Sequence, residues 1–259
     1  MRLLISRIDA IGDVCLTLPA IGWLKENFPN FHVNLLVQAY AAPIAKAWIP
    51  IRSGVIGRIY NWLYCNRLIK LSRSGSGQHE SYLNLLALTR SLKLPDPDFN
   101  DFKKNIVKYA GLESLRKLDP QKSTHIILHP FSRGSGREWP IANFIELANL
   151  LVKKELIPVI AGISSDYDQI KPFVSQFPNQ TIWAMGEGDL ETYMKRIGQS
   201  GALVASGTGP LHISSLMNVP SIGLFPPRQD IDPTRWGTIN PLSCSLTSQN
   251  NCQQKCSNK

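Results

Sequence analysis

The chain has 259 residues, of which 43% are hydrophobic and 18% charged, which excludes the disordered and fibrous classes, and its length favours about two domains. Lysine and arginine number 28 against 19 acidic residues, and the net charge of +9 favours an anionic partner: nucleic acid, a phosphorylated small molecule or a membrane surface. Because Arg7 and Asp9 interrupt the first apolar run and no run reaches about 18 residues, we expect neither a signal peptide nor a transmembrane helix.

The cysteines are scattered and number five: Cys15, Cys65, Cys244, Cys252 and Cys256. Without an export signal, they are expected to be free thiols in a reducing, cytoplasmic compartment. The last three have C-x7-C-x3-C spacing, which differs from the paired C-x2-C hooks of a strong zinc site. We therefore expect no metal site.

The first half begins as a βαβ unit and then becomes mostly helical. Hydrophobic periodicity predicts, in order, a strand at Leu3–Arg7, a helix at Leu16–Asn27, a strand at His32–Val37, and helices at Glu80–Leu92 and near Phe102–Tyr109. Between them lies a basic and aromatic stretch, Ile51–Arg73, which contains no acidic residue, followed by a loop with the composition of a flexible segment, Ser72–Gln78.

The second half alternates regularly between strands and helices. A polar segment with Pro120 predicts a linker, and we place the domain boundary after residue 118, giving domains 1–118 and 119–259. The predicted strands are Thr124–His129, Ile157–Ala161, Ala202–Ser206 and Ser221–Phe225; the predicted helices are Ile141–Lys153, Asp166–Gln176, Leu190–Ile197 and Leu211–Met217. This pattern is typical of a parallel sheet covered by helices, so the fold class is α/β with two such halves and a cleft between them.

The first strand leads into the turn DAIGD, Asp9–Asp13, where nucleotide-binding proteins often hold phosphate on a helix N-terminus. Asp13 would repel an anion there. A structural explanation is that Asp13 caps the first helix. A functional one is that it handles a proton.

Two loops in the second half have the composition of an anion site. After Ser206 the chain reads GTGPLH, where the glycines allow close backbone approach, Thr208 can cap, and free N–H groups at the helix start face an anion. After His129 it reads PFSRGSGREWP, with Arg133 and Arg137 around glycines. Each loop alone is also explained by turn chemistry or by a solvated basic loop.

Taken together, these segments resemble glycosyltransferase family 9, the heptosyltransferases. The resemblance covers most of the chain and is carried by RIDAIGDVCLTLPAIGWLK, by His79-Glu80 with Leu83-Asn84, by HP…S…REWP…F, by SGTGPLHISSL with GLFPP, and by Pro233–Gly237 (PTRWG). It implies a GT-B-like fold of two Rossmann-like parallel-sheet domains facing a cleft, the first of them shortened between Gln38 and Ile51.

The resemblance also implies an activity: inverting, metal-independent transfer of a sugar, heptose in this family, from a nucleotide-sugar donor such as ADP-heptose to a lipopolysaccharide-core glycolipid, without a cofactor. Asp13 would be the catalytic base, facing the donor across the cleft. The donor-binding residues that it implies are Ser132, Arg137, Asp166, Thr208, Gly209, Pro210, Leu211 and His212. Many family members have aspartate where this chain has Gly207, so any role of that acid is lost or relocated.

Three alternatives are weighed beside this function. A metal-dependent GT-A transferase would use a D-x-D motif, which occurs at Asp166–Asp168 and Asp230–Asp232. A nucleotide-sugar-binding protein without transferase activity would follow if the shortened first domain lacked an acceptor site. A nucleic-acid binder would explain the charge but has no recognised motif, so we expect no nucleic-acid partner.

The segment Val55–Leu71 combines apolar side chains, Trp62 and Tyr64 with only positive charges. Such a composition is typical of elements that lie in a membrane interface, although the same apolar residues could belong to the core of the first domain. We expect the protein to bind the cytoplasmic face of the membrane peripherally.

Overall fold

The computed structural model describes residues 2–7, 9–37, 71, 73, 76–116, 119, 122–134, 137–227 and 231–247. The chain forms two compact units, Met1–Glu113 and Ser114–Lys259. The sequence favours a boundary after residue 118, which itself lies outside the described residues. The shortened connection expected after Gln38 and most of the basic segment Val55–Leu71 also lie outside them.

The first unit opens with two parallel strands, β1 (Arg2–Arg7) and β2 (His32–Val37), paired in register from Arg2 with His32 to Arg7 with Val37. Two helices connect them, α1 (Ile11–Cys15) and α2 (Leu18–Asn27), where the sequence predicts one helix from Leu16. The break has a covalent cause: Pro19 has no N–H, so it cannot donate to the Cys15 carbonyl as a continuous helix would require.

The other described helices of this unit are α5 (Glu80–Leu92), as predicted, α6 (Phe99–Lys104) and α7 (Ile106–Ala110), with a short 3-10 turn at Glu113–Leu115 across the unit boundary. The single helix predicted near Phe102–Tyr109 is wrong, because Asn105 leaves helical geometry at φ −102 and ψ 7 and separates α6 from α7. The core lies among α2, α5, α6 and α7, which contribute the buried side chains Leu24, Leu83, Phe102 and Ile106 respectively.

The second unit contains a six-stranded sheet in the order β5-β4-β3-β6-β7-β8, with all neighbours parallel. Its strands are β3 (His125–His129), β4 (Ile157–Gly162), β5 (Ile182–Met185), β6 (Ala202–Ser206), β7 (Ser221–Phe225) and β8 (Cys244–Thr247). The four predicted strands are confirmed within a residue or so. Strands β5 and β8, which the sequence analysis missed, form the two edges.

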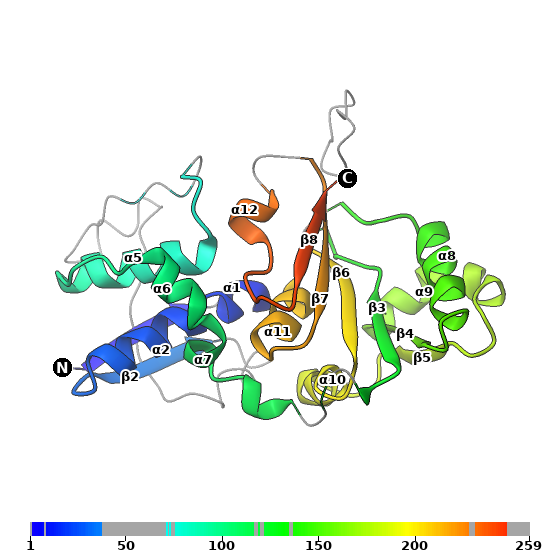
Figure 1. Ribbon diagram of the computed structural model, residues 1–259, viewed down its shortest axis with the longest axis horizontal. Helices are drawn as coiled ribbons and strands as arrows, with labels where there is room; N and C mark the ends of the chain where they lie inside the picture. Colours follow the sequence, from blue (N-terminus) through cyan, green and yellow to red (C-terminus); the bar gives the residue numbers. More distant parts are fainter. Residues whose placement is uncertain are drawn as a thin grey trace. The chain divides into compact units, whose positions relative to one another are not determined.

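Helices of the second unit pack on the sheet, with α8 (Ile141–Val152) against β4 and α11 (Gly209–Leu216) against β6 and β7 (Figure 1). The others are α10 (Leu190–Ile197), α12 (Pro233–Trp236) and a broken segment at 164–176. That segment consists of a 3-10 turn (Ser164–Asp166), α9 (Tyr167–Ile170) and a second 3-10 turn (Lys171–Gln176), so the predicted helix Asp166–Gln176 is wrong. Pro172 lacks the N–H that would continue α9.

The strand order places a switch point in the middle of the sheet. From β3 the chain moves outward through β4 to β5, and it then returns to the other side of β3 to form β6, β7 and β8. Crossovers between parallel strands are right-handed, so the change of direction sends the connecting helices to opposite faces. Ligands of open parallel sheets bind where the carboxyl-end loops diverge in this way, which here is between β3 and β6.

The contact between α2 and α7 generates a stability prediction. Alanine is normally about 1 kcal/mol better than glycine inside a helix. At Gly22, however, a Cβ atom would lie 1.9 Å from the Tyr109 carbonyl oxygen. We expect Gly22→Ala to lower the free energy of unfolding by about 2–3 kcal/mol, measured by urea unfolding.

Gly77→Ala is the matched control, because its Cβ would meet nothing within 4 Å and only its φ of +65° costs energy, about 1 kcal/mol. A Gly22→Ala protein as stable as the original would contradict the close approach of α2 to α7.

Candidate functional site

Asp13 lies in the first unit as the third residue of α1, just after β1. The N-cap is Ala10 and no side chain caps the helix, so the interpretation of Asp13 as a helix cap is wrong. Its backbone N–H donates to the Ala10 carbonyl at 3.0 Å, while its side chain remains 25% exposed. The carboxylate is therefore held by the first turn and still reaches solvent.

Arg7, the last residue of β1, holds the two carboxylates of the turn. Its Nη2 atom lies 3.2 Å from Asp13 Oδ1 and its Nη1 atom 3.4 Å from Asp9 Oδ2. The guanidinium is mostly buried, whereas Asp9 is the more exposed of the two acids. Pairing with a fixed guanidinium restricts the rotamers of the carboxylates.

The paired motif His79-Glu80 and Leu83-Asn84 has a structural use in α5. The His79 Nδ1 atom accepts from the Ser81 N–H at 3.2 Å and caps the helix. Glu80 forms an ion pair with Arg73, and Asn84 donates to the Leu16 carbonyl at 3.1 Å, which lies in the break between α1 and α2. Asn84 of this motif thus connects α5 to the end of α1, the helix that carries Asp13.

In the second unit, the loop after β3 carries Ser132 and Arg137. The buried Ser132 donates its N–H to Glu138 Oε1 at 2.5 Å, which closes the loop on itself. Arg137 is exposed, and its carbonyl accepts from Ser206 Oγ, at the end of β6, at 3.5 Å. This contact brings the β3 loop and the end of β6 together at the carboxyl edge, on the two sides of the switch point.

The turn after β6 leads into α11 with Thr208 at the N-cap position. Thr208 does not cap, because its Oγ1 donates to the Ser206 carbonyl at 3.1 Å. The Leu211 N–H, expected to face an anion, instead donates to the Thr208 carbonyl at 3.1 Å, so that expectation is wrong. Gly209 and Pro210 are the first two helical positions, so helix geometry gives the Gly209 N–H no intrahelical acceptor. His212 lies one turn in and is buried.

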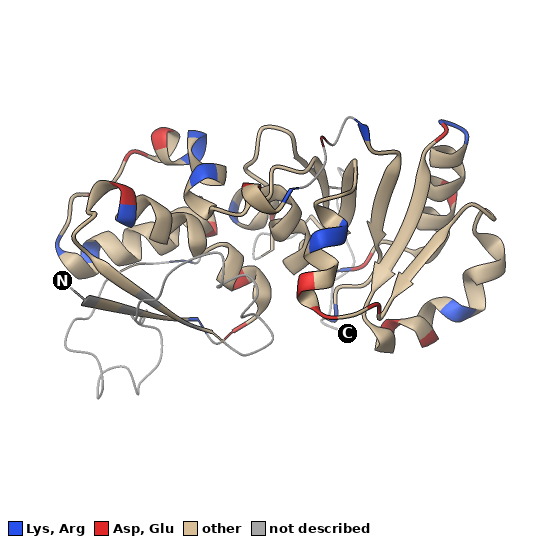
Figure 2. Ribbon diagram, turned by 90° about the horizontal axis from the view of Figure 1, so that it is seen from below, with Lys and Arg blue, Asp and Glu red and all other residues tan. Residues whose placement is uncertain are grey.

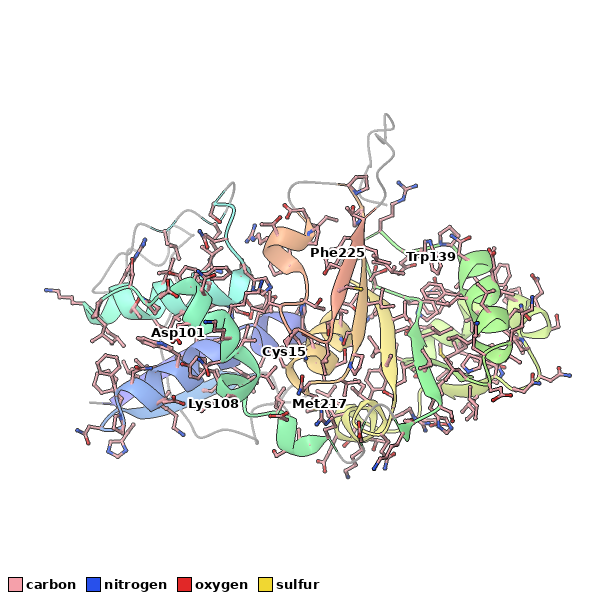
Figure 3. All side chains as sticks on the ribbon, in the orientation of Figure 1. Cys15, Asp101, Lys108, Trp139, Met217 and Phe225 are labelled. Atoms are coloured by element: carbon pink, nitrogen blue, oxygen red, sulfur yellow. The ribbon has the colours of Figure 1, made fainter. Side chains whose placement is uncertain are left out.

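Gly207 is required by its neighbour on β7. A Cβ atom at this position would lie 2.6 Å from Cε1 of Phe225. Phe225 is the last residue of β7 and is labelled in Figure 3. Phe225 is itself buried, so its ring cannot swing away into solvent. The packing of this chain therefore favours glycine at 207, where the resemblance implies aspartate.

Asp166 ends the turn after β4 and is buried. Its Oδ2 atom accepts from the Ile163 N–H at 3.1 Å, and Gly162 leaves room for it, because a Cβ there would lie 3.0 Å from that oxygen. Burial raises the pKa of Asp166, against the opposing effects of that hydrogen bond and of nearby Arg133. A buried acid at the carboxyl edge is a candidate for binding a ligand hydroxyl.

The two D-x-D motifs have local uses in this fold. Asp166 closes the turn after β4, while Asp232 caps α12 by accepting from the Thr234 N–H at 2.7 Å and from the Arg235 N–H at 3.3 Å. Asp168 is exposed and Asp230 lies outside the described residues. Among the residues that the structure describes, no three His, Cys, Asp or Glu side chains gather as a metal ligand set.

A pair at the end of β3, the buried His129 and the partly buried Tyr193, was not found by sequence reasoning. His129 Nδ1 lies 3.1 Å from the Tyr193 hydroxyl of α10, and burial lowers the pKa of His129 to about 4. Burial raises the pKa of Tyr193. Both groups are therefore neutral at pH 7. The pair adds no charge at the end of β3, where the loop with Ser132 begins.

Figure 2 shows Lys and Arg interspersed with Asp and Glu along the helices and loops of the described chain. At the candidate anion site of the second unit, the groups suited to an anion are the N-terminal end of α11 and the exposed Arg137.

Comparisons with known proteins point to one family. A model of glycosyltransferase family 9 (heptosyltransferase) matches residues 32–259. A Haemophilus influenzae protein with a provisional glycosyltransferase assignment is 24% identical over 307 aligned positions, covering 93% of this chain and 87% of that protein.

Two solved structures share the fold, which is of the GT-B type. The E. coli heptosyltransferase WaaC, solved with ADP, superposes with a TM-score of 0.72 and 15% identity, covering 96% of this chain and 93% of that chain. A family 9 glycosyltransferase from Veillonella parvula superposes with a TM-score of 0.70 and 16% identity, covering 95% and 86%.

The buried Asp166 generates a prediction with a defined sign. Because its pKa is raised in the folded state, folding favours the neutral acid, and the folded protein loses stability relative to the unfolded chain as the pH rises through that pKa. Asparagine keeps the oxygen that accepts from Ile163 but never ionises. We expect Asp166→Asn to increase the free energy of urea unfolding at pH 8 and the gain to shrink toward pH 4.

Asp168→Asn is the control, because Asp168 is an exposed neighbour of Asp166. An equal effect of both variants on the free energy of unfolding would contradict the argument from burial.

Proposed function

The chain belongs to glycosyltransferase family 9, and on this premise we propose that it transfers heptose from ADP-heptose to a lipopolysaccharide-core glycolipid, with inversion and without a metal ion. The observation that carries the proposal is the meeting of the Ser132–Arg137 loop and the start of α11 at the switch point of the second unit's sheet. This is the place where an open parallel sheet binds a nucleotide. The E. coli relative solved with ADP has the same fold.

The donor-binding residues in this proposal are those gathered at the carboxyl edge. The Gly209 N–H and the positive end of α11 contact the diphosphate, and the exposed Arg137 offers it a guanidinium. Thr208, Pro210 and Leu211 shape this turn, and Ser132 holds the facing loop through Glu138. Asp166 accepts from a ribose hydroxyl.

Charge that develops on the leaving diphosphate is stabilised by these fixed cationic and dipolar groups. His212, one turn into α11, supplies a further donor to a phosphate oxygen when protonated. These groups take the part that a divalent cation has in metal-dependent transferases. Undiminished activity in a chelator would support this point, and loss that added metal restores would reject it.

Asp13 is proposed as the catalytic base. As the acceptor hydroxyl attacks the anomeric carbon, its proton must leave, and an ionised, partly exposed carboxylate can take it. The sugar–oxygen bond to the diphosphate breaks as the new bond forms on the opposite face, which inverts the anomeric configuration.

The competing proposal is a protein that binds the nucleotide sugar without transferring it. A chain that bound ADP-heptose but released no ADP with any lipopolysaccharide-core acceptor would favour that alternative. The alternative keeps the second unit's donor site and removes the role of Asp13.

Our first functional prediction concerns Asp13→Asn. It should leave ADP-heptose binding nearly unchanged, since the donor residues lie in the second unit, and lower turnover about 100-fold or more, since the base is lost. ADP release in steady state measures turnover, and the ligand-induced rise in unfolding temperature measures binding. The control is Asp9→Asn, the other carboxylate on Arg7, with turnover within about twofold. Equal turnover of Asp13→Asn and the original protein would require another base.

A second prediction concerns the membrane. We propose that the protein binds the cytoplasmic leaflet peripherally through the basic segment Val55–Leu71, most of which lies outside the described residues. No helix within the described ranges is long and apolar enough to cross a bilayer. Binding to vesicles containing anionic lipid should fall as salt rises and weaken when Arg67 and Lys70 are changed to glutamine, by about 1 kcal/mol per charge. Co-sedimentation measures it. Equal binding to neutral and anionic vesicles, or none to either, would assign the segment to the core.

A further inference from the structure

The short helix that carries Asp13 cannot hold its own position. α1 has five residues, and helices of that length are not stable by themselves. The break before α2 also takes away the backbone donors that a continuous helix would supply to the Asp13 and Leu16 carbonyls. Thr17 N–H donates to Val14 at 3.0 Å instead of to Asp13, and Ala20 N–H donates to Thr17 at 3.1 Å instead of to Leu16.

Side chains replace both lost bonds. Thr17 Oγ1 donates to the Asp13 carbonyl at 2.8 Å. Asn84, which lies on α5, donates from Nδ2 to the Leu16 carbonyl at 3.1 Å and to Thr17 Oγ1 at 3.3 Å. The backbone of Asp13 is thus connected to α5 through Thr17 and Asn84.

The orientation of the Asn84 amide is fixed from the other side. Arg73 Nη2 donates to Asn84 Oδ1 at 3.0 Å, so the amide must turn its NH₂ group toward Leu16 and Thr17. Arg73 in turn pairs with Glu80 through Nη1. Glu80, Asn84 and Thr17 are each no more than 4% exposed, so no solvent competes for these bonds.

We propose that Asn84 is a positioning residue, which, through Thr17 and with Arg73 and Glu80 behind it, fixes the direction of the Asp13 carboxylate. The proposal rests on the proposed function, because it gives Asp13 the role of base. It assigns the His79-Glu80 and Leu83-Asn84 motif to the reaction, although none of these side chains touches the reacting atoms.

The structural part of the proposal is tested without any substrate. In Asn84→Asp the carboxylate still binds Arg73 but offers no donor to Leu16, so α1 should open more often. The Asp13 and Val14 amides, which donate to the Ala10 carbonyl at 3.0 and 3.3 Å, should exchange hydrogen about 10-fold faster. The control is Thr89→Val, which removes a buried hydroxyl from the same helix α5 and should leave α1 unaffected.

The catalytic part is tested with ADP-heptose and a lipopolysaccharide-core acceptor. Misplacing the base should lower kcat of Asn84→Asp about 10- to 100-fold while KM for ADP-heptose stays within about twofold. A role in overall stability alone would instead lower the unfolding temperature and the amount of active protein, with the kcat of folded molecules unchanged.

Two variants at Thr17 test the same proposal if Asn84→Asp fails to fold. Thr17→Val removes the hydroxyl and should show the same loss of kcat and faster exchange in α1, whereas Thr17→Ser keeps the hydroxyl and should behave like the original protein. Equal behaviour of the Val and Ser variants, or exchange that rises equally across the first unit, would overturn the proposal. Faster exchange confined to α1 in a protein with no transferase activity would reject the proposed function and leave the positioning network standing.

Discussion

All six strands of the second unit's sheet are parallel, so their carboxyl ends lie at the same edge. The reversal of strand order between β3 and β6 separates the loops that follow these two strands. The site depends on this constraint. It brings the loop after β3, which carries the buried Ser132 and the exposed Arg137, next to the start of α11. Arg137 and Ser206, which meet there, are 69 residues apart in the chain. The hydrogen bond from Ser206 Oγ to the Arg137 carbonyl marks the meeting point.

The first unit uses the same kind of βα turn for a different purpose. Its helix N-terminus is capped by no side chain and carries an acid, Asp13, that is paired with Arg7. Under the proposed function, this turn holds a proton acceptor and the second unit offers donors to an anion. On that proposal, the division accounts for an acid at a position that phosphate-binding proteins keep free of negative charge.

Much of the fold could be predicted because apolar runs define buried strands, as at His125–His129 and Ala202–Ser206. Strand β8 was missed because it is an edge strand with three of four residues exposed, so no alternation reveals it. The break at Leu16–Thr17 was missed because Pro19 suits a helix start as well as a helix end. At the site, sequence identified the residues of the α11 turn but not which N–H groups the helix itself uses, since Leu211 and Thr208 form bonds that only backbone geometry decides.

The contact between Gly207 and Phe225 also bears on how this chain could diverge from its relatives. Gly207 directly follows β6 and Phe225 ends the neighbouring strand β7, and a Cβ at Gly207 would overlap the phenylalanine ring. An aspartate at 207 would therefore require the ring at 225 to shift or to be replaced by a smaller side chain, so the effect of a substitution at either position depends on the residue at the other.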